Sequence, residues 1–263
     1  MDILRLTNID SRLKNGSTYP LLINALKPNN KETSYVLKTY NKHHNETTFA
    51  IAKEIIVSEL AKKFDLNVPD YGLIKIDNQL LKPYYTEDFI NNLDNGYKFC
   101  NEFIDGTVSA VSDVSKKYLD NYEYAKLYAF DQLIMNADRG RYDNKPNLLY
   151  TDTKMILIDH EITFPFYSQL QNEANYFNIF QMFYCKNHLF WNNLNKLKTK
   201  DKLHIFEEFI EILRNLNFDF LNFIFDELDK YNIPYGRKEV ILSYLYWAKS
   251  NYSKIHKILN QKI

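Results

Sequence analysis

One stretch, FDQLIMNADRGRYDNKPNLLYTDTKMILIDHEITF from Phe130 to Phe164, constrains what this chain can fold into more than any other. Apolar residues at helical spacing lead into the polar segment NADRGRYDNKP, which is followed by the apolar run LLY, a TDT turn and a second apolar run, KMILI. This pattern predicts a buried helix, a loop, a strand, a turn and a second strand. It puts Asp138 in the loop, Asn147 at the start of one strand and Asp159 at the end of the next.

These three polar residues suit phosphoryl transfer. That chemistry needs one Asp to accept or orient the attacking hydroxyl, and an Asn and a second Asp to hold Mg²⁺ on the phosphates. Mg²⁺ prefers hard oxygen ligands and completes its shell with water and substrate phosphate. Each carboxylate alone is more often a solvated turn residue or a helix cap. The three together, in this order and context, favour a catalytic site.

A kinase also needs a strand Lys for the α- and β-phosphates and a Glu on the following helix to pair with it. The run SYVLKTY supplies Lys38, and AKEIIVSEL supplies Glu54, with Glu59 as a competing candidate. Neither residue type is specific alone, because a strand Lys is usually solvated. Their position ahead of the Asp and Asn residues indicates the pair.

A turn that covers the phosphates is expected before Lys38. The segment RLKNGSTYP offers Lys14, Gly16, Ser17 and Thr18, whose backbone N–H groups could cradle phosphate. The segment has one Gly and not the G-x-G-x-x-G pattern, so an ordinary turn is an equal interpretation.

The remaining pattern indicates an α+β protein. The first hundred residues read as strands and turns around one helix, TTFAIAKEIIVSELAKKF, with Thr47 or Thr48 available as its cap. Beyond Gly106 the pattern is helical, including DKLHIFEEFIEILRNL and the amphipathic run RKEVILSYLYWAKSNYSKIHKIL. We expect two lobes, 1–104 and 105–263, with a cleft for a ligand between them.

Composition excludes several other classes. Lys and Arg number 33 against 33 Asp and Glu, so the basic surface of a general nucleic-acid binder is not expected. Two cysteines without a CxxC pair indicate neither a disulfide framework nor a zinc site. No leader-like N-terminus and no long apolar run is seen, so we expect a soluble cytoplasmic protein that does not bind membranes.

The motifs resemble the catalytic segment of the HipA-like kinases. FDQLIMNADR, NLL and ILIDHEITF are similar to that family's N-x-D-R loop, N-L-L strand and I-D-H strand end, which replace the H-R-D, Asn and D-F-G of ordinary protein kinases. LAKKFDLNVPDYGLIKID and NIPYGRKEVILSYL resemble two further family segments. The resemblance extends over about residues 10–250.

The resemblance implies a two-lobed protein-kinase-like fold, in which 1–104 is the ATP-binding lobe and 105–263 the catalytic and helical lobe. It implies Asp138 as the catalytic base, Asn147 and Asp159 as Mg²⁺ ligands, and Lys38 as the ATP-phosphate lysine with Glu54 as its partner. It also implies that Arg139 orients the loop or contacts an acidic group.

The same resemblance places adenine recognition near Cys100 to Phe103, through backbone groups that include those of Glu102 and Phe103. Gly16, Ser17 and Thr18 would contact the phosphates of the ATP cofactor. His160 is interpreted as a packing residue, because Asp138 already fills the role of base.

The chain departs from the pattern at three points. The general kinase loop has its Asn five positions after the Asp, whereas Asn147 follows Asp138 by nine positions, so Asn144 is kept as the reserve ligand. Glu161 occupies a position where many relatives have Gly. The chain is also short for a full-length HipA toxin, and we expect it to lack the extra N-terminal subdomain of those toxins, so their antitoxin binding does not carry over.

We therefore expect a Mg-ATP-dependent serine/threonine kinase of an unidentified protein, with a toxin-type or phage-defence role and an inhibitory or antitoxin-like partner by family analogy. Two alternatives stay open. One is a kinase for a lipid or small molecule, and the other is a pseudokinase that acts as a binding or regulatory module.

Overall fold

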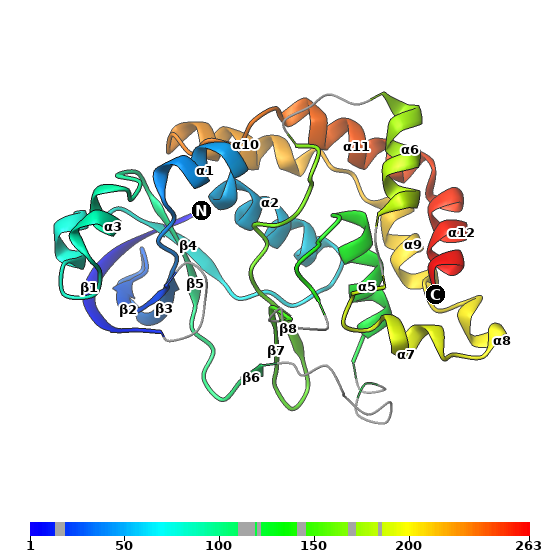
Figure 1. Cartoon of the computed structure of the whole chain (residues 1–263), viewed down its shortest axis with the longest axis horizontal. Helices are drawn as coiled ribbons and strands as arrows, with labels where there is room; N and C mark the ends of the chain where they lie inside the picture. Colours follow the sequence, from blue (N-terminus) through cyan, green and yellow to red (C-terminus); the bar gives the residue numbers. More distant parts are fainter. Residues whose placement is uncertain (14–18, 110–118, 120–121, 141–145, 168–171, 184–185) are drawn as a thin grey trace. The chain divides into compact units, whose positions relative to one another are not determined.

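The computed structural model describes residues 1–263 except 14–18, 110–118, 120–121, 141–145, 168–171 and 184–185 (Figure 1). The chain is mixed α/β and divides into two compact units. The first unit comprises Met1–Ile56, Pro69–Asp105 and Asn222–Tyr235, and the second comprises Val57–Val68, Gly106–Leu221 and Gly236–Ile263. Neither unit is one continuous piece of chain, and the predicted lobe boundary after residue 104 stays a prediction.

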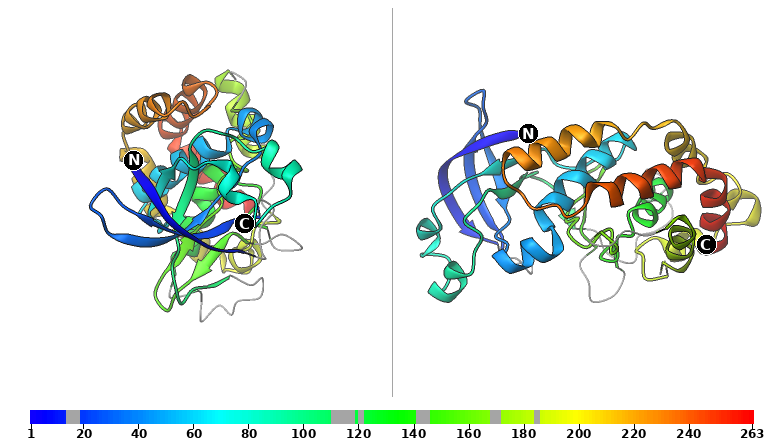
Figure 2. Two further views of the ribbon diagram at one scale, coloured as in Figure 1. Left: turned by 90° about the vertical axis from the view of Figure 1, so that its left-hand side faces the viewer. Right: turned by 90° about the horizontal axis from the view of Figure 1, so that it is seen from above.

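The first unit is built on a closed five-stranded barrel. Its strands are β1 (Asp2–Arg12), β2 (Leu21–Leu26), β3 (Glu32–Leu37), β4 (Tyr71–Ile74) and β5 (Lys98–Glu102), in the spatial order β1-β2-β3-β5-β4. The β1–β4 pair is parallel and closes the ring, while the other pairs are antiparallel. Figure 2 shows the long β1 in dark blue, curving as a barrel strand must.

Alternation along β2 shows why these residues form a strand with one buried face. Leu21, Ile23 and Ala25 point into the barrel and are fully buried, while Leu22, Asn24 and Leu26 are partly exposed. The segment between β4 and β5 carries the 3₁₀ helix η1 (Asn78–Leu81) and α3 (Glu87–Asn91), which contribute Leu81 and Ile90 to the same core.

Two helices follow β3, where the sequence predicted one. Helix α1 (Lys42–Thr48) ends where Phe49 adopts a left-handed conformation, and α2 (Ala50–Lys63) begins directly afterwards. The predicted Thr47 or Thr48 cap is wrong, because both hydroxyls donate to carbonyl oxygens within α1. The side chain of Asn45 instead accepts the N–H of Ile51 at the start of α2, at 3.2 Å.

The second unit holds the segment from Phe130 to Phe164. Helix α5 (Tyr124–Leu133) is buried along its whole length. Strands β7 (Leu148–Tyr150) and β8 (Met155–Leu157) form a hairpin, and β6 (Val108–Ser109) pairs with the outer edge of β7. The predicted helix, loop, strand, turn and strand are therefore confirmed, and α5 packs through aromatic rings such as Phe130 against Phe64, 5.4 Å between centroids.

Seven further helices complete the described chain: α6 (Glu173–Met182), α7 (Trp191–Asn195), α8 (Thr199–Lys202), α9 (Glu207–Asn215), α10 (Phe220–Lys230), α11 (Lys238–Ser250) and α12 (Tyr252–Lys262). The amphipathic run after Arg237 is two helices and not one, since the chain turns sharply at Asn251 (Figures 1 and 2). Among the described helices, none is long and apolar enough to cross a membrane.

Candidate active site

Asp138 and Asn147 are brought into direct contact in the second unit. The amide Nδ2 of Asn147 donates to Oδ2 of Asp138 at 2.6 Å. Asp138 follows α5 in the loop, where its own N–H donates to the side-chain oxygen of Asn136 at 2.9 Å. Two side chains that are nine positions apart in the sequence therefore touch.

Asn147 and Asp159 both adopt left-handed backbone conformations, with φ of 48° and 63°. Asn and Asp tolerate this region better than other residues with a side chain. The two positions lie across the open end of the β7–β8 hairpin, where the N–H of Ile158 donates to the carbonyl oxygen of Asn147 at 3.1 Å. Non-glycine residues in such conformations are typical of functional sites.

Burial raises the pKa of Asp138, and the nearby negative charges of Asp159 and Glu161 add to this, whereas the Asn147 hydrogen bond and Arg139 oppose it. The carboxylates are thus close enough to repel each other. A carboxylate with a raised pKa is a better proton acceptor than an ordinary Asp side chain. His160, which follows Asp159, is buried as the sequence interpretation expected, and its carbonyl accepts the Thr163 hydroxyl at 2.8 Å.

Arg139 is fully buried and is not a surface residue. Its Nε donates to Oδ2 of Asp131 at 2.8 Å, and its Nη2 donates to Oδ1 at 3.3 Å. Its Nη1 donates to the carbonyl oxygens of Asn147 and of Ile158, the latter at 3.3 Å. The guanidinium therefore joins α5 to Asn147, one candidate metal ligand, and to Ile158, the residue before the other. Its contact with Asp131 agrees with the prediction that Arg139 contacts an acidic group.

His188 completes this buried network from a distant part of the sequence. Its Nδ1 accepts the N–H of Phe190 at 3.1 Å, so the ring proton is on Nε2 and is donated to Asp131 at 3.0 Å. Burial lowers the pKa of His188 in spite of Asp131, so the ring is neutral. Burial alone would raise the pKa of Asp131, but Arg139 and His188 outweigh it and hold that pKa at about 2.

The backbone around His188 also supports the loop, since the N–H of Leu189 donates to the carbonyl oxygen of Arg139 at 2.9 Å. Asp131 and His188 were not among the residues predicted from the sequence. A charged residue inside the otherwise apolar run FDQLIM was the available signal for Asp131. No spacing rule connects His188 with a loop some fifty residues earlier.

Lys38 and Glu54 are paired in the first unit. The Nζ of Lys38 donates to Oε1 of Glu54, which is fully buried on α2, and the hydroxyl of Tyr40 donates to the same oxygen at 3.2 Å. Glu59, the competing candidate, pairs with Lys62 near the surface at 2.8 Å. The structure thus joins Lys38 to Glu54, while their roles toward a nucleotide stay predictions.

Two N–H groups in the predicted adenine-binding segment already have partners. The N–H of Glu102 donates to Asp70 at 2.7 Å, and the N–H of Phe103 donates to Ser34 at 2.8 Å. These two amides hold β5 and its exit in place, while recognition of adenine through other backbone groups near Cys100 to Phe103 stays a prediction. The side chain of Glu102 is bound to Lys27 at 2.8 Å.

The predicted phosphate-covering residues Lys14, Gly16, Ser17 and Thr18 lie outside the described residues, as does the reserve ligand Asn144.

The donor set of the second unit fits a hard divalent cation. Two carboxylates, Asp138 and Asp159, and the amide oxygen of Asn147 offer oxygen only, which suits Mg²⁺ and leaves room for water and phosphate. In the described part of the chain, no three His, Cys, Asp or Glu side chains gather in a way that could hold a metal by themselves. A metal bound here would therefore draw on Asn147 and on its substrate for ligands.

The model of the HipA-like kinase family matches residues 6–220 of this chain. Two solved structures show a distant likeness. A Helicobacter pylori proinflammatory kinase, CtkA, is 11% identical with a TM-score of 0.42, over 91% of this chain and 93% of that one. A Golgi casein kinase solved with Mn/ADP bound is 12% identical with a TM-score of 0.43, over 99% and 74%. No curated protein matches the chain.

Proposed function

The chain belongs to the HipA-like kinase family, and on that premise we propose that it transfers the γ-phosphoryl group of Mg-ATP to a Ser or Thr hydroxyl of a protein. In this proposal the first unit is the strand-rich ATP-binding lobe of a protein-kinase-like fold, and the second unit is the catalytic lobe. The observation that carries the proposal is the 2.6 Å bond between Asn147 and Asp138 within the segment matched by the family model.

Asp138 acts as the base. It accepts the proton of the acceptor hydroxyl as the hydroxyl oxygen bonds to the γ-phosphorus and the bond to the β,γ-bridging oxygen breaks, which releases ADP. Its raised pKa supports this role, because proton transfer to a stronger base is more favourable. Asn147 orients the Asp138 carboxylate through its amide N–H groups, and Arg139 holds the backbone of Asn147.

Lys38 would bind the α- and β-phosphates, and Glu54 and Tyr40 would keep its ammonium group in place. Asn147 and Asp159 would hold Mg²⁺, which when bound neutralises the charge of the phosphates. A buried Lys–Glu pair adds little to the free energy of unfolding, because desolvation of two charges offsets most of their attraction. Its presence is therefore better explained by a functional role than by stability.

The test is transfer of labelled phosphate from [γ-³²P]ATP to proteins of a cell lysate by wild type, Asp138→Asn and Asp152→Asn. Asp138→Asn keeps the shape and can still accept the Asn147 hydrogen bond, so it removes only the base. We expect wild type and Asp152→Asn to label a discrete protein and Asp138→Asn to lose about 10²-fold or more of that rate. Asp152 is an exposed residue of the β7–β8 turn and serves as the matched control.

Labelling by Asp138→Asn at the wild-type rate would exclude Asp138 as the base. Labelling of lipid or of a small metabolite instead of protein would favour the first alternative, a kinase with a different acceptor. ADP binding without any transfer would favour the pseudokinase.

By family analogy we also propose a growth-regulating or phage-defence role, with a partner protein that restrains the kinase. Induced expression of wild type should arrest growth, whereas Asp138→Asn should not. Equal arrest by both proteins would contradict a role that depends on phosphorylation.

A further inference from the structure

Strand β8 positions Asp159, which follows the strand by two residues. On one edge β8 pairs with β7, and the N–H of Ile158 donates to the carbonyl oxygen of Asn147 at 3.1 Å. The preceding N–H, that of Leu157, points the opposite way and donates to the carbonyl oxygen of Asn67 at 2.8 Å. The backbone just before Asp159 is thus held from both sides.

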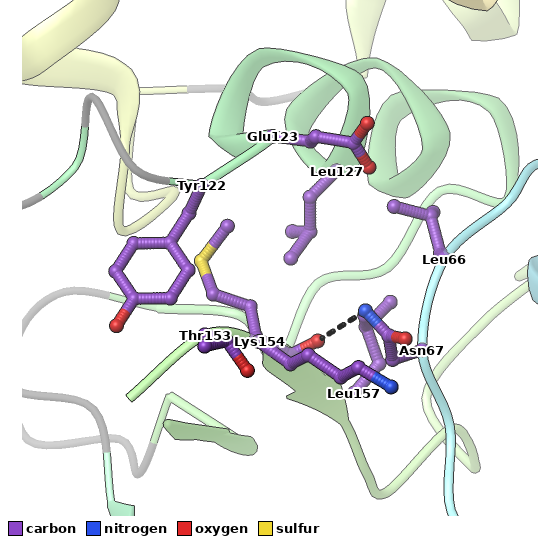
Figure 3. Close-up of a pocket in the computed structure, with 9 residues that line it drawn as sticks. Leu66, Asn67, Tyr122, Glu123, Leu127, Thr153, Lys154 and Leu157 are labelled. Carbon is purple, nitrogen blue, oxygen red and sulfur yellow. Dashed lines mark hydrogen bonds between the residues drawn. The ribbon is translucent and has the colours of Figure 1, made fainter. Parts of the chain in front are cut away.

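Asn67 makes a second bond to the same strand. Its side-chain Nδ2 donates to the carbonyl oxygen of Met155 at 3.2 Å (Figure 3). One residue therefore bonds to β8 at two points, Met155 and Leu157, and forms a parallel bridge with Ile156 between them. Side-chain amides often replace a missing backbone group in this way. Asn67 takes the place of a fourth strand at the outer edge of this sheet.

A cavity interrupts the packing at this edge. Beside Asn67 lies a cavity of about 260 Å³, lined by Met155 and Leu157 of β8 together with Leu66 and Leu127 (Figure 3). Leu157 and Leu127 are fully buried in spite of this cavity, so apolar packing also holds β8. The Asn67 hydrogen bonds add what packing alone does not supply on that side of the strand, because they select which backbone groups of β8 are bonded.

We propose that Asn67 is a positioning residue that fixes the register of β8 and thereby holds Asp159 in place to bind the divalent metal. The inference rests on the proposed function for the identity of the metal site. Asn67 lies in the segment after α2, so the proposal gives a residue outside the β7–β8 hairpin a role in metal binding at the end of β8.

The experiment compares Asn67→Leu with Asn251→Leu in the full chain. Leu is branched like Asn but larger, and the apolar-lined cavity beside it can take the added volume, so Asn67→Leu removes the donor without creating a void. Asn251 is the matched control, because its side chain also donates to a backbone carbonyl, that of Trp247, at 2.9 Å. If Asn67→Leu shows no cooperative melting, Asn67→Asp takes its place, since it is isosteric and cannot donate.

Two readouts are needed. Binding of Mn²⁺ in the presence of ADP, followed by electron paramagnetic resonance, should weaken about 3- to 10-fold in Asn67→Leu, less than the ~10- to 100-fold typical of groups bonded to the ligands themselves. Hydrogen exchange should speed up at the amides of Leu157 and Ile158. Asn251→Leu should match wild type in both measurements.

Faster exchange at β8 with unchanged Mn²⁺ affinity would overturn the proposal, since Asn67 would then be structural only. Unchanged exchange would also overturn it, as would a wild-type protein that binds no Mn²⁺. If wild type binds Mn²⁺ but transfers no phosphate, and Asn67→Leu weakens that binding, the proposed function fails while the positioning role stands.

Discussion

At the scale of single residues, the strongest constraint is the buried charge of Arg139. Asp131 is its ionic partner, and both side chains are fully buried. We expect Asp131→Asn to lower the free energy of unfolding by about 3–5 kcal/mol, because it leaves a buried guanidinium without a counter-charge. Urea unfolding measures this. The matched control is Glu211→Gln in the exposed Arg214–Glu211 pair, which should change stability by about 0.5 kcal/mol or less.

The carboxylate of Asp131 should also make the free energy of unfolding depend on pH. Its pKa is held at about 2, below the usual 3.8, so the stability that ionised Asp131 contributes is fully present above pH 3.8 and is lost as the pH falls through about 2. The difference in unfolding free energy between wild type and Asp131→Asn should therefore be constant above pH 3.8 and narrow below it. A difference that stays constant down to pH 2 would contradict the shifted pKa.

Asn147 combines a strained backbone with a candidate ligand, and two variants separate these features. Gly accepts the φ of 48° without strain, whereas Ala does not. We expect Asn147→Gly to be about 1 kcal/mol more stable than Asn147→Ala in urea, and both to lose phosphoryl transfer. If Asn147→Gly retains the activity, the side chain of Asn147 is not a metal ligand in wild type, and Asn144 becomes the candidate ligand.

Among the elements, β5 carries an unusual residue. Lys98 is buried, its Nζ donates to the carbonyl oxygen of Asp94 at 2.5 Å, and burial lowers its pKa to about 8 in spite of Asp94. A depressed lysine pKa contributes stability that is present above the unfolded value of 10.5 and is lost as the pH falls through about 8. The buried charge of Lys98 should therefore lower the free energy of unfolding of wild type at pH 7.

We expect Lys98→Met to be about 1–2 kcal/mol more stable than wild type at pH 7, since Met avoids burial of a charge. This advantage should shrink between pH 8 and 10.5 in chemical denaturation at a series of pH values. A Lys98→Met protein less stable than wild type at pH 7 would show that the ammonium group has a stabilising partner.

Element boundaries were the least predictable part of the fold. Sequence periodicity was sufficient for α5, β7 and β8, where apolar runs are bounded by turn residues. It failed at Phe49 and Asn251, because neither residue is a Gly or Pro that would mark the end of a helix in the sequence. Asn45 could not be identified as the cap of α2 for the same reason, since its partner lies beyond the end of α1.

At the scale of the whole molecule, nucleotide binding should be visible as stabilisation. A ligand at 100 times its Kd adds about 2.7 kcal/mol, which for a chain of this size raises the Tm by about 5–10 °C. We expect Mg-ADP to have this effect on wild type but not on the double variant Lys38→Met/Glu54→Gln. The double variant removes both charges of the buried pair, so it leaves neither one uncompensated.

The matched control is Lys62→Met/Glu59→Gln, which removes a pair near the surface of the same helix. Thermal melts with and without Mg-ADP would show the wild-type shift for this control. An equal shift in Lys38→Met/Glu54→Gln would mean that Lys38 does not contact the phosphates.

The candidate site was predictable where a few residues close in sequence carry the chemistry, and less so where distant segments meet. Asp138, Asn147 and Asp159 could be named because they fall within one stretch with a clear order of helix, loop and strands. Asp131 and His188 are bonded to each other through their side chains, and Asn67 is bonded to a backbone carbonyl, and neither kind of hydrogen bond leaves a characteristic spacing in one sequence. The hydrogen bonds of the Glu102 and Phe103 N–H groups were not predictable, because a strand pattern does not show which N–H groups the neighbouring strands already use.

The closed barrel has a consequence for how a substrate chain can dock. Many proteins capture an extended peptide by adding it as a strand to an open sheet edge. Each of the five described strands of this barrel has a neighbour on both sides, so an open edge remains only where a strand extends past its neighbour, as β1 does beyond the Asp2–Leu4 register that it shares with β4. A peptide cannot add to the paired part of the barrel unless one of the existing strand pairs separates, and the same closure protects those strands against edge-to-edge aggregation. Recognition of a peptide by that part of the first unit would therefore depend on side chains.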